Sequence, residues 1–132
     1  MGARRKSREA ALKILFEADF NKVPMGGIAD RMITEQEIDI EVVQFIQKLL
    51  DAYQDHEVDV NQLIEKHSSN WKLSRMASVD RNILRLGVCE ILFLRDIPKN
   101  VTINEYLEIA KKYGTEDSSS FINGILDKIE KR

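Results

Sequence analysis

Proline and glycine are scarce in this chain: two prolines and six glycines interrupt 132 residues. Between them, apolar residues recur every three or four positions, a spacing that gathers them on one face of a helix. A half-buried strand would need apolar residues at alternate positions, and no segment is a convincing example. We therefore expect an all-α protein, a compact bundle of about six to seven helices.

The helix boundaries follow from capping residues and helix breakers. A first helix is expected over residues 5–20, followed by a loop over residues 21–33 that contains Pro24 and two glycines. Capping patterns predict helix starts at Thr34, Asp59 and Thr102, where a side-chain oxygen can accept a free backbone N–H. The remaining helices are expected over residues 79–94 and from the serine cluster at 118–120 to residue 129, and Gly114 is expected in a left-handed conformation.

Composition indicates a soluble globular protein, with 43% apolar and 32% charged residues. The length suits a single domain spanning residues 1–132. No run of about 18 apolar residues is present, so no membrane-spanning helix is expected, and the N-terminal stretch is too charged for a secretory signal. A lone cysteine, Cys89, cannot form an internal disulfide, which agrees with a cytoplasmic location.

Charge is unevenly distributed along the chain. Residues 1–13 contain five basic side chains and one acidic one, a charge of +4, whereas the remaining residues sum to −6. A positive end on an acidic body indicates a polyanionic partner. The alternative is a solvated terminus without a partner.

No residue pattern indicates catalysis, a metal site or a cofactor. The two adjacent glycines are too few to cradle a phosphate. His56 and His67 have no second ligand at metal-binding spacing, and Cys89 lies in an apolar helical stretch typical of a packed core thiol. Binding is therefore the expected activity: the segment from Arg4 to Arg8 could neutralise several phosphates of single-stranded RNA. Three aromatic residues could stack on bases, although core packing is the alternative for each: Phe16, Tyr113 and Phe121.

Three blocks of the sequence resemble the NusB family of transcription antitermination factors. Residues 4–16 are similar to the arginine-rich first helix of that family, and residues 71–87 with Glu90 resemble its central helix. The C-terminal block is the most specific, with Ile97-Pro98, Val101-Thr-Ile-Asn-Glu105, Ala110-Lys111, Gly114 and Phe121-Ile-Asn-Gly-Ile-Leu-Asp127.

The resemblance implies an all-helical fold of two bundled subdomains and a binding function without catalysis. Members of the family bind the boxA element of nascent RNA together with NusE, a small-subunit ribosomal protein. That complex joins an antitermination assembly on RNA polymerase, notably on ribosomal RNA operons.

By motif position, the resemblance also implies two sets of site residues. The RNA-binding set is Arg4, Arg5, Lys6, Arg8, Lys112, Tyr113, Phe121 and Asp117, the last where a carboxylate tempers RNA affinity. The NusE-binding set is Phe16, Ser74, Asp80 and Arg85. Phe16 replaces a tyrosine of some members and Ser74 an acidic residue, so part of the partner contact differs here.

Three other functions are compatible with parts of the pattern. NusB-like domains occur as RNA-binding appendages of RNA methyltransferases, but a chain of 132 residues leaves no room for a nucleotide-cofactor domain. A protein-interaction or homodimeric helical module would make the basic end incidental or cover it. An enzyme is the weakest alternative.

Overall fold

The structure, a computed structural model, describes residues 2–69 and 71–131. This part of the chain forms six α-helices and one short 3₁₀ turn, without a strand, so the all-α prediction is confirmed. In chain order the elements are α1 (Ala3–Asn21), α2 (Met25–Glu35), α3 (Ile40–Lys66), η1 (Leu73–Arg75), α4 (Ser78–Phe93), α5 (Lys99–Tyr113) and α6 (Ser118–Leu126).

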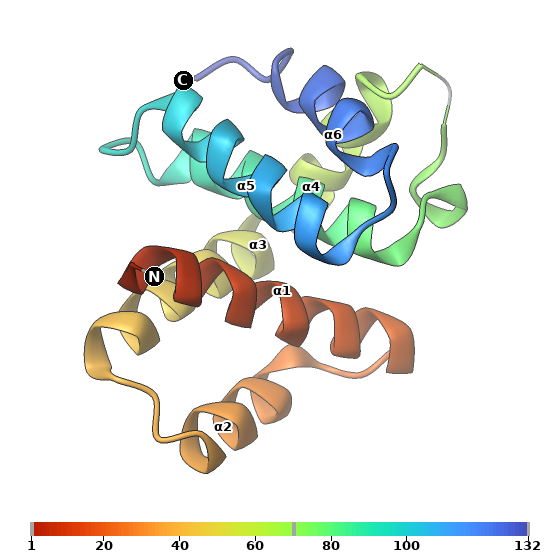
Figure 1. Cartoon of the computed structure of the whole chain (residues 1–132). Helices are drawn as coiled ribbons and strands as arrows, with labels where there is room; N and C mark the ends of the chain where they lie inside the picture. The colour runs from red at the N-terminus through yellow and green to blue at the C-terminus, as the bar shows by residue number, and fades with distance from the viewer. Residues whose placement is uncertain (1, 70, 132) are drawn as a thin grey trace.

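The helices are arranged in two halves that α3 connects (Figure 1). Helices α1 and α2 and the start of α3 make one half, and α4, α5 and α6 make the other. Helix α3 has non-helical backbone angles at His56 (φ −129°, ψ 22°), where it bends. The imidazole of His56 stacks on Phe93 at the end of α4, with ring centroids 3.9 Å apart. The kink therefore lies where α3 meets the second half.

Helix α4 supplies the centre of the core. Its inward residues include Ile83, Leu86 and Ile91, none of which is exposed to solvent. Neighbouring helices α1, α3, α5 and α6 all pack against it. Cys89 is buried in this helix, as predicted for a core thiol, and burial raises its pKa to about 12.

The loop predicted over residues 21–33 is wrong, because most of it is helix α2. Pro24 immediately precedes the helix in an extended conformation, which suits its restricted φ. The two glycines occupy the first turn, and Ile28 and Ala29 are buried against the core. Tertiary burial of these two residues thus outweighs the low helix propensity of glycine.

Two of the predicted capping boxes do not start a helix. Thr34 lies in the last turn of α2, and α3 begins six residues later, at Ile40. Asp59 lies three residues beyond the non-helical His56, in the second of the two helical segments of α3, so the predicted start is displaced toward the kink.

The third capping box is also wrong, because α5 begins at Lys99, directly after a proline. Thr102 is therefore inside the helix and buried, and its hydroxyl donates a hydrogen bond to Glu90 instead of capping. Gly114 ends α5 with an extended backbone (φ −95°, ψ −166°) rather than a left-handed one.

Candidate nucleic-acid interface

The basic N-terminal segment lies on α1, and its cationic side chains point in two directions. The side chains of Arg4 and Arg5 are 55% and 36% exposed, and Lys6 is exposed as well. The side chain of Arg8 is only 3% exposed, because it faces α4 and α5. The structure therefore divides the predicted RNA-binding cluster into a surface group and one interior arginine.

Arg8 is held by a buried carboxylate. Its Nε and Nη2 atoms each donate to one oxygen of Glu90, both at 2.8 Å. The hydroxyls of Thr102 and Tyr106 donate to the same carboxylate at 2.6 and 3.1 Å. Burial alone would lower the pKa of Arg8, but the bonds to Glu90 outweigh it and raise that pKa. In this structure Arg8 joins α1 to α4 and α5, and its role as an RNA contact stays a prediction.

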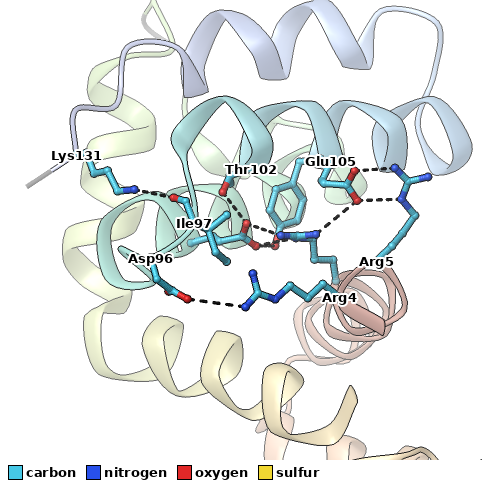
Figure 2. A network of polar contacts seen from close by, with 10 residues as sticks. Arg4, Arg5, Asp96, Ile97, Thr102, Glu105 and Lys131 are labelled. Atoms are coloured by element: carbon cyan, nitrogen blue, oxygen red, sulfur yellow. Dashed lines mark hydrogen bonds and ion pairs between the residues drawn. The ribbon is translucent and has the colours of Figure 1, made fainter. Parts of the chain in front are cut away.

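The two exposed arginines are also paired with carboxylates, and Figure 2 shows both pairs beside the Arg8 network. Arg5 donates through Nε and Nη2 to Glu105, at 3.0 and 2.7 Å. The hydrogen bonds from Arg5 lower the pKa of that carboxyl. Arg4 lies 3.8 Å from Asp96 and 5.2 Å above the ring of Phe45. Both guanidinium groups are thus oriented by the protein while remaining partly open to solvent.

Lys112 and Tyr113, at the end of α5, meet α1 at Glu9. The Lys112 ammonium and the Tyr113 hydroxyl both donate to one oxygen of Glu9, at 2.7 and 2.5 Å. Burial would raise the pKa of Glu9, but these two bonds lower it below its usual value. Lys13, a residue that the sequence reasoning missed, places its ammonium 5.8 Å from the Tyr113 ring centroid. The end of α5 therefore adds cations and an aromatic ring to the surface of α1.

A cleft of about 400 Å³ lies between these residues and the loop that joins α2 to α3. Its lining is mixed in charge, with lysines from α1 and α5 on one side and carboxylates of the loop on the other. The principal side chains are Lys6, Lys13, Lys112, Tyr113, Met32, Ile38, Glu37 and Asp39. Such a cleft offers both apolar contact for a base and cations for phosphate.

Asp117 and Phe121 lie at the start of α6, in the next segment of the chain. Asp117 is exposed, and Phe121 is half-buried and packs partly against the core. Phe121 is therefore not confined to the core, and part of its surface is accessible.

The exposed cations of this surface are largely compensated by acidic neighbours. Arg4, Arg5 and Lys112 each have a carboxylate oxygen within 4.0 Å. These carboxylates are the feature that sequence reasoning missed, since the pattern assigns Glu105 to a helix cap. A phosphate that binds here must share or displace an existing partner, so its net gain in free energy is small.

A largely apolar groove adjoins this surface along α1. Phe16 and Phe20 stack with their ring centroids 6.2 Å apart, and Phe20 is 70% exposed. Met32, Val79 and Tyr113 complete the groove, which brings α2, α4 and α5 together at α1. Phe16 was expected at a partner interface, whereas Phe20 was not, although its spacing of four residues from Phe16 was the available signal.

The other predicted partner residues are not gathered at this groove. Ser74 is exposed in η1, and Asp80 is half-buried with its Oδ1 lacking a hydrogen bond to any described residue. Arg85 is 13% exposed and is bound internally by Asn61, Asn82 and Asp19. The donors of Arg85 are thus used inside the protein, and its contact with a partner stays a prediction.

Two other kinds of site were searched for in residues 2–69 and 71–131. No group of three or more histidine, cysteine or acidic side chains there is arranged to hold a metal ion. None of the helices in this part of the chain is long and apolar enough to cross a membrane.

An all-helical fold with a basic first helix and an adjoining apolar groove is the architecture of an antitermination factor of the NusB type. The NusB family model matches residues 5–131, and the chain belongs to this family. A transcription antitermination protein NusB from Geobacter sulfurreducens is 45% identical over 130 residues, covering 98% of this chain and 94% of that protein. One from Myxococcus xanthus is 41% identical over 133 residues, covering 98% and 95%.

Solved structures agree with this assignment. NusB of T. maritima superposes with a TM-score of 0.89 at 38% identity, covering 96% of this chain and 89% of that one. A second structure contains antitermination factors NusB and NusE in complex with double-stranded RNA. It matches with a TM-score of 0.88 at 29% identity, covering 98% of this chain and 96% of that one.

Proposed function

We propose that this protein is a transcription antitermination factor that binds boxA-type single-stranded RNA together with NusE. The complex would join the antitermination assembly on RNA polymerase and promote processive transcription of ribosomal RNA operons. The observation that carries the proposal is the basic surface of α1 and α5 beside an exposed apolar groove, in a chain that belongs to the NusB family.

The RNA would be held by the exposed cations, with Tyr113 and Phe121 as stacking surfaces. These cations are Arg4, Arg5, Lys6 and Lys112, and Arg8, the other predicted contact, lies buried. Contacts to three or four phosphates of a single strand predict a salt slope of roughly −2 to −3. Since most of these cations already face carboxylates, the protein alone should bind RNA weakly.

The protein partner would occupy the groove around Phe16 and Phe20. An exposed phenylalanine stacked on a second one, with further apolar residues alongside, is typical of the anchor of a protein interface. A basic partner seated there would add positive surface next to Lys112 and Tyr113. RNA affinity would then rise without a new contact on this chain, because both proteins hold one strand.

The test is fluorescence anisotropy of a labelled boxA-type RNA, titrated with this protein alone and with NusE present. We expect a large gain in affinity with NusE that a scrambled RNA does not show. Changing Arg4 and Arg5 together to alanine should weaken RNA binding and leave NusE binding intact. Phe20→Ala should have the converse effect, and Lys48→Ala, on an exposed face of α3, is the matched control.

Two outcomes would contradict the proposal. A salt-independent affinity would mean that the arginine surface does not hold phosphate. No RNA binding in either condition by a folded protein would instead favour the alternative of a protein-interaction or homodimeric module. The exposed groove favours that alternative, and a concentration-dependent change in size that Phe20→Ala abolishes would identify it.

A further inference from the structure

A second basic cleft lies at the other end of the second half, between the end of α3 and the tail that follows α6. It has a volume of about 410 Å³. Its apolar lining comes from Leu63, Leu92 and Ile129. Three lysines and one glutamate give the remaining lining a charge of +2, with the histidine neutral: Lys66, Lys128, Lys131, Glu130 and His67.

Two lysines of this cleft, like Lys6 and Lys13 on α1 and unlike the paired Arg4, Arg5 and Lys112, have no acidic partner in the described part of the chain. Within residues 2–69 and 71–131, neither Lys66 nor Lys128 has a carboxylate oxygen within 4.0 Å, whereas Arg4, Arg5 and Lys112 each do. A phosphate arriving at Lys66 or Lys128 would displace no carboxylate of the described residues. Its attraction to each lysine would therefore not be offset by the loss of an ion pair.

Capping of a helix end does not account for the position of Lys128. Lysines commonly serve the free carbonyls at helix C-termini, and Lys66 lies in the last turn of α3. At the end of α6, however, the ammonium that donates to the carbonyl of Asp127 belongs to Lys99, at 2.8 Å. The Lys128 side chain is therefore left to line the cleft and is exposed.

The loop that joins α4 to α5 lies between the arginine surface and this cleft, and both contact it. Arg4 reaches this loop at Asp96, and Lys131 donates to the carbonyl of the next residue, Ile97, at 2.6 Å. Figure 2 shows Arg4 and Lys131 approaching the loop from opposite sides. A strand leaving α1 across this loop would therefore arrive at Lys131 and the cleft.

We propose that RNA bound on α1 continues across the α4–α5 loop into this cleft, where Lys66 and Lys128 hold its phosphates. The inference rests on the proposed function and extends it to RNA outside the boxA element. A half-buried apolar side chain, Leu63, beside two uncompensated cations suits one unpaired nucleotide, whose base packs on Leu63 while its phosphates face the lysines. The contact of both Arg4 and Lys131 with the α4–α5 loop favours RNA that extends from α1 over an acidic peptide.

The experiment compares a core boxA-type RNA with the same RNA extended by a flanking single-stranded segment, at either end in turn, with NusE present. The unaltered protein should bind one extended RNA more tightly than the core RNA and with a steeper salt slope. In Lys66→Gln/Lys128→Gln, the loss of two phosphate contacts should reduce that slope by about 1.4. If affinities converge near 1 M salt, the double variant should bind that extended RNA about 25-fold more weakly at about 0.1 M salt.

Controls separate this inference from the function on which it rests. Binding of the core RNA should be unchanged in the double variant, Lys48→Gln should bind both RNAs normally, and Lys66→Arg/Lys128→Arg should retain the advantage of the extension. An extension that adds nothing, or a double variant that weakens both RNAs equally, would overturn the inference alone. If the unaltered protein binds neither RNA, the proposed function is overturned and this inference with it.

Discussion

Replacing Arg8 with methionine should destabilise the protein strongly, because it leaves the carboxylate of Glu90 buried without its cation. Glu90 has no exposed surface, and two of its four hydrogen bonds come from the Arg8 guanidinium. The hydroxyls of Thr102 and Tyr106 still donate, but they do not neutralise the charge. Removing one partner of a buried ion pair costs about 3–5 kcal/mol. We expect a loss in this range in the free energy of unfolding.

A double-mutant cycle separates the charge effect from loss of packing. Glu90→Gln alone should also destabilise, but by less than Arg8→Met, because Arg8 keeps Glu105 at 3.5 Å as a second carboxylate partner. Arg8→Met/Glu90→Gln leaves no buried charge, and the glutamine carbonyl still accepts from Thr102 and Tyr106. The double variant should therefore be more stable than either single variant.

The assay is urea unfolding followed by circular dichroism at neutral pH, with the slope against urea checked for each variant. A loss below about 1 kcal/mol for Arg8→Met would refute the reasoning, since typical surface changes cost no more than that. Additive losses in the double variant would refute it as well, because they would mean that the two side chains act independently.

Three further predictions concern packing and charge. Gly87→Ala should cost about 1–3 kcal/mol in a thermal melt, because its Cβ would lie 2.9 Å from the methyl carbons of Leu126, whereas Gly124→Ala has open space and should stabilise. Glu105→Gln should raise RNA affinity up to about fivefold at low salt, because the negative carboxylate that competes with phosphate for Arg5 is removed. Anisotropy titrations measure this, and an unchanged affinity would contradict it. Since Arg5 lowers the pKa of Glu105, the stability from this pair should be present above the usual pKa of 4.5 and lost as pH falls through the lowered value. When Glu105→Gln is titrated with acid, its free energy of unfolding should fall less over that pH range than that of the unaltered protein.

Helices with a long apolar stripe could be predicted from the sequence, whereas those stabilised by tertiary packing could not. The prediction for residues 79–94 agrees with α4 within one residue at each end, because its apolar stripe is long and a proline follows. Helix α2 was not predictable, since two glycines occupy its first turn and its stabilisation comes from burying Ile28 and Ala29. The bend at His56 likewise depends on packing against Phe93 from another helix.

The candidate site shows the same division between local and long-range effects. The charge of the N-terminal segment was enough to predict exposed cations at Arg4 and Arg5. The burial of Arg8 was not predictable, because its partner Glu90 lies 82 residues away in the sequence. The same holds for Glu105, 100 residues from Arg5, which a local pattern assigns to a helix cap.

The course of α3 through both halves has a consequence for how the molecule loses its structure. Ile46, before the bend, and Ile64, after it, are both fully buried. Because α1 and α4 pack against each other as well as against α3, loss of either half would expose buried surface of the other. Denaturation should proceed as one cooperative event, so the basic surface and the apolar groove are kept or lost together.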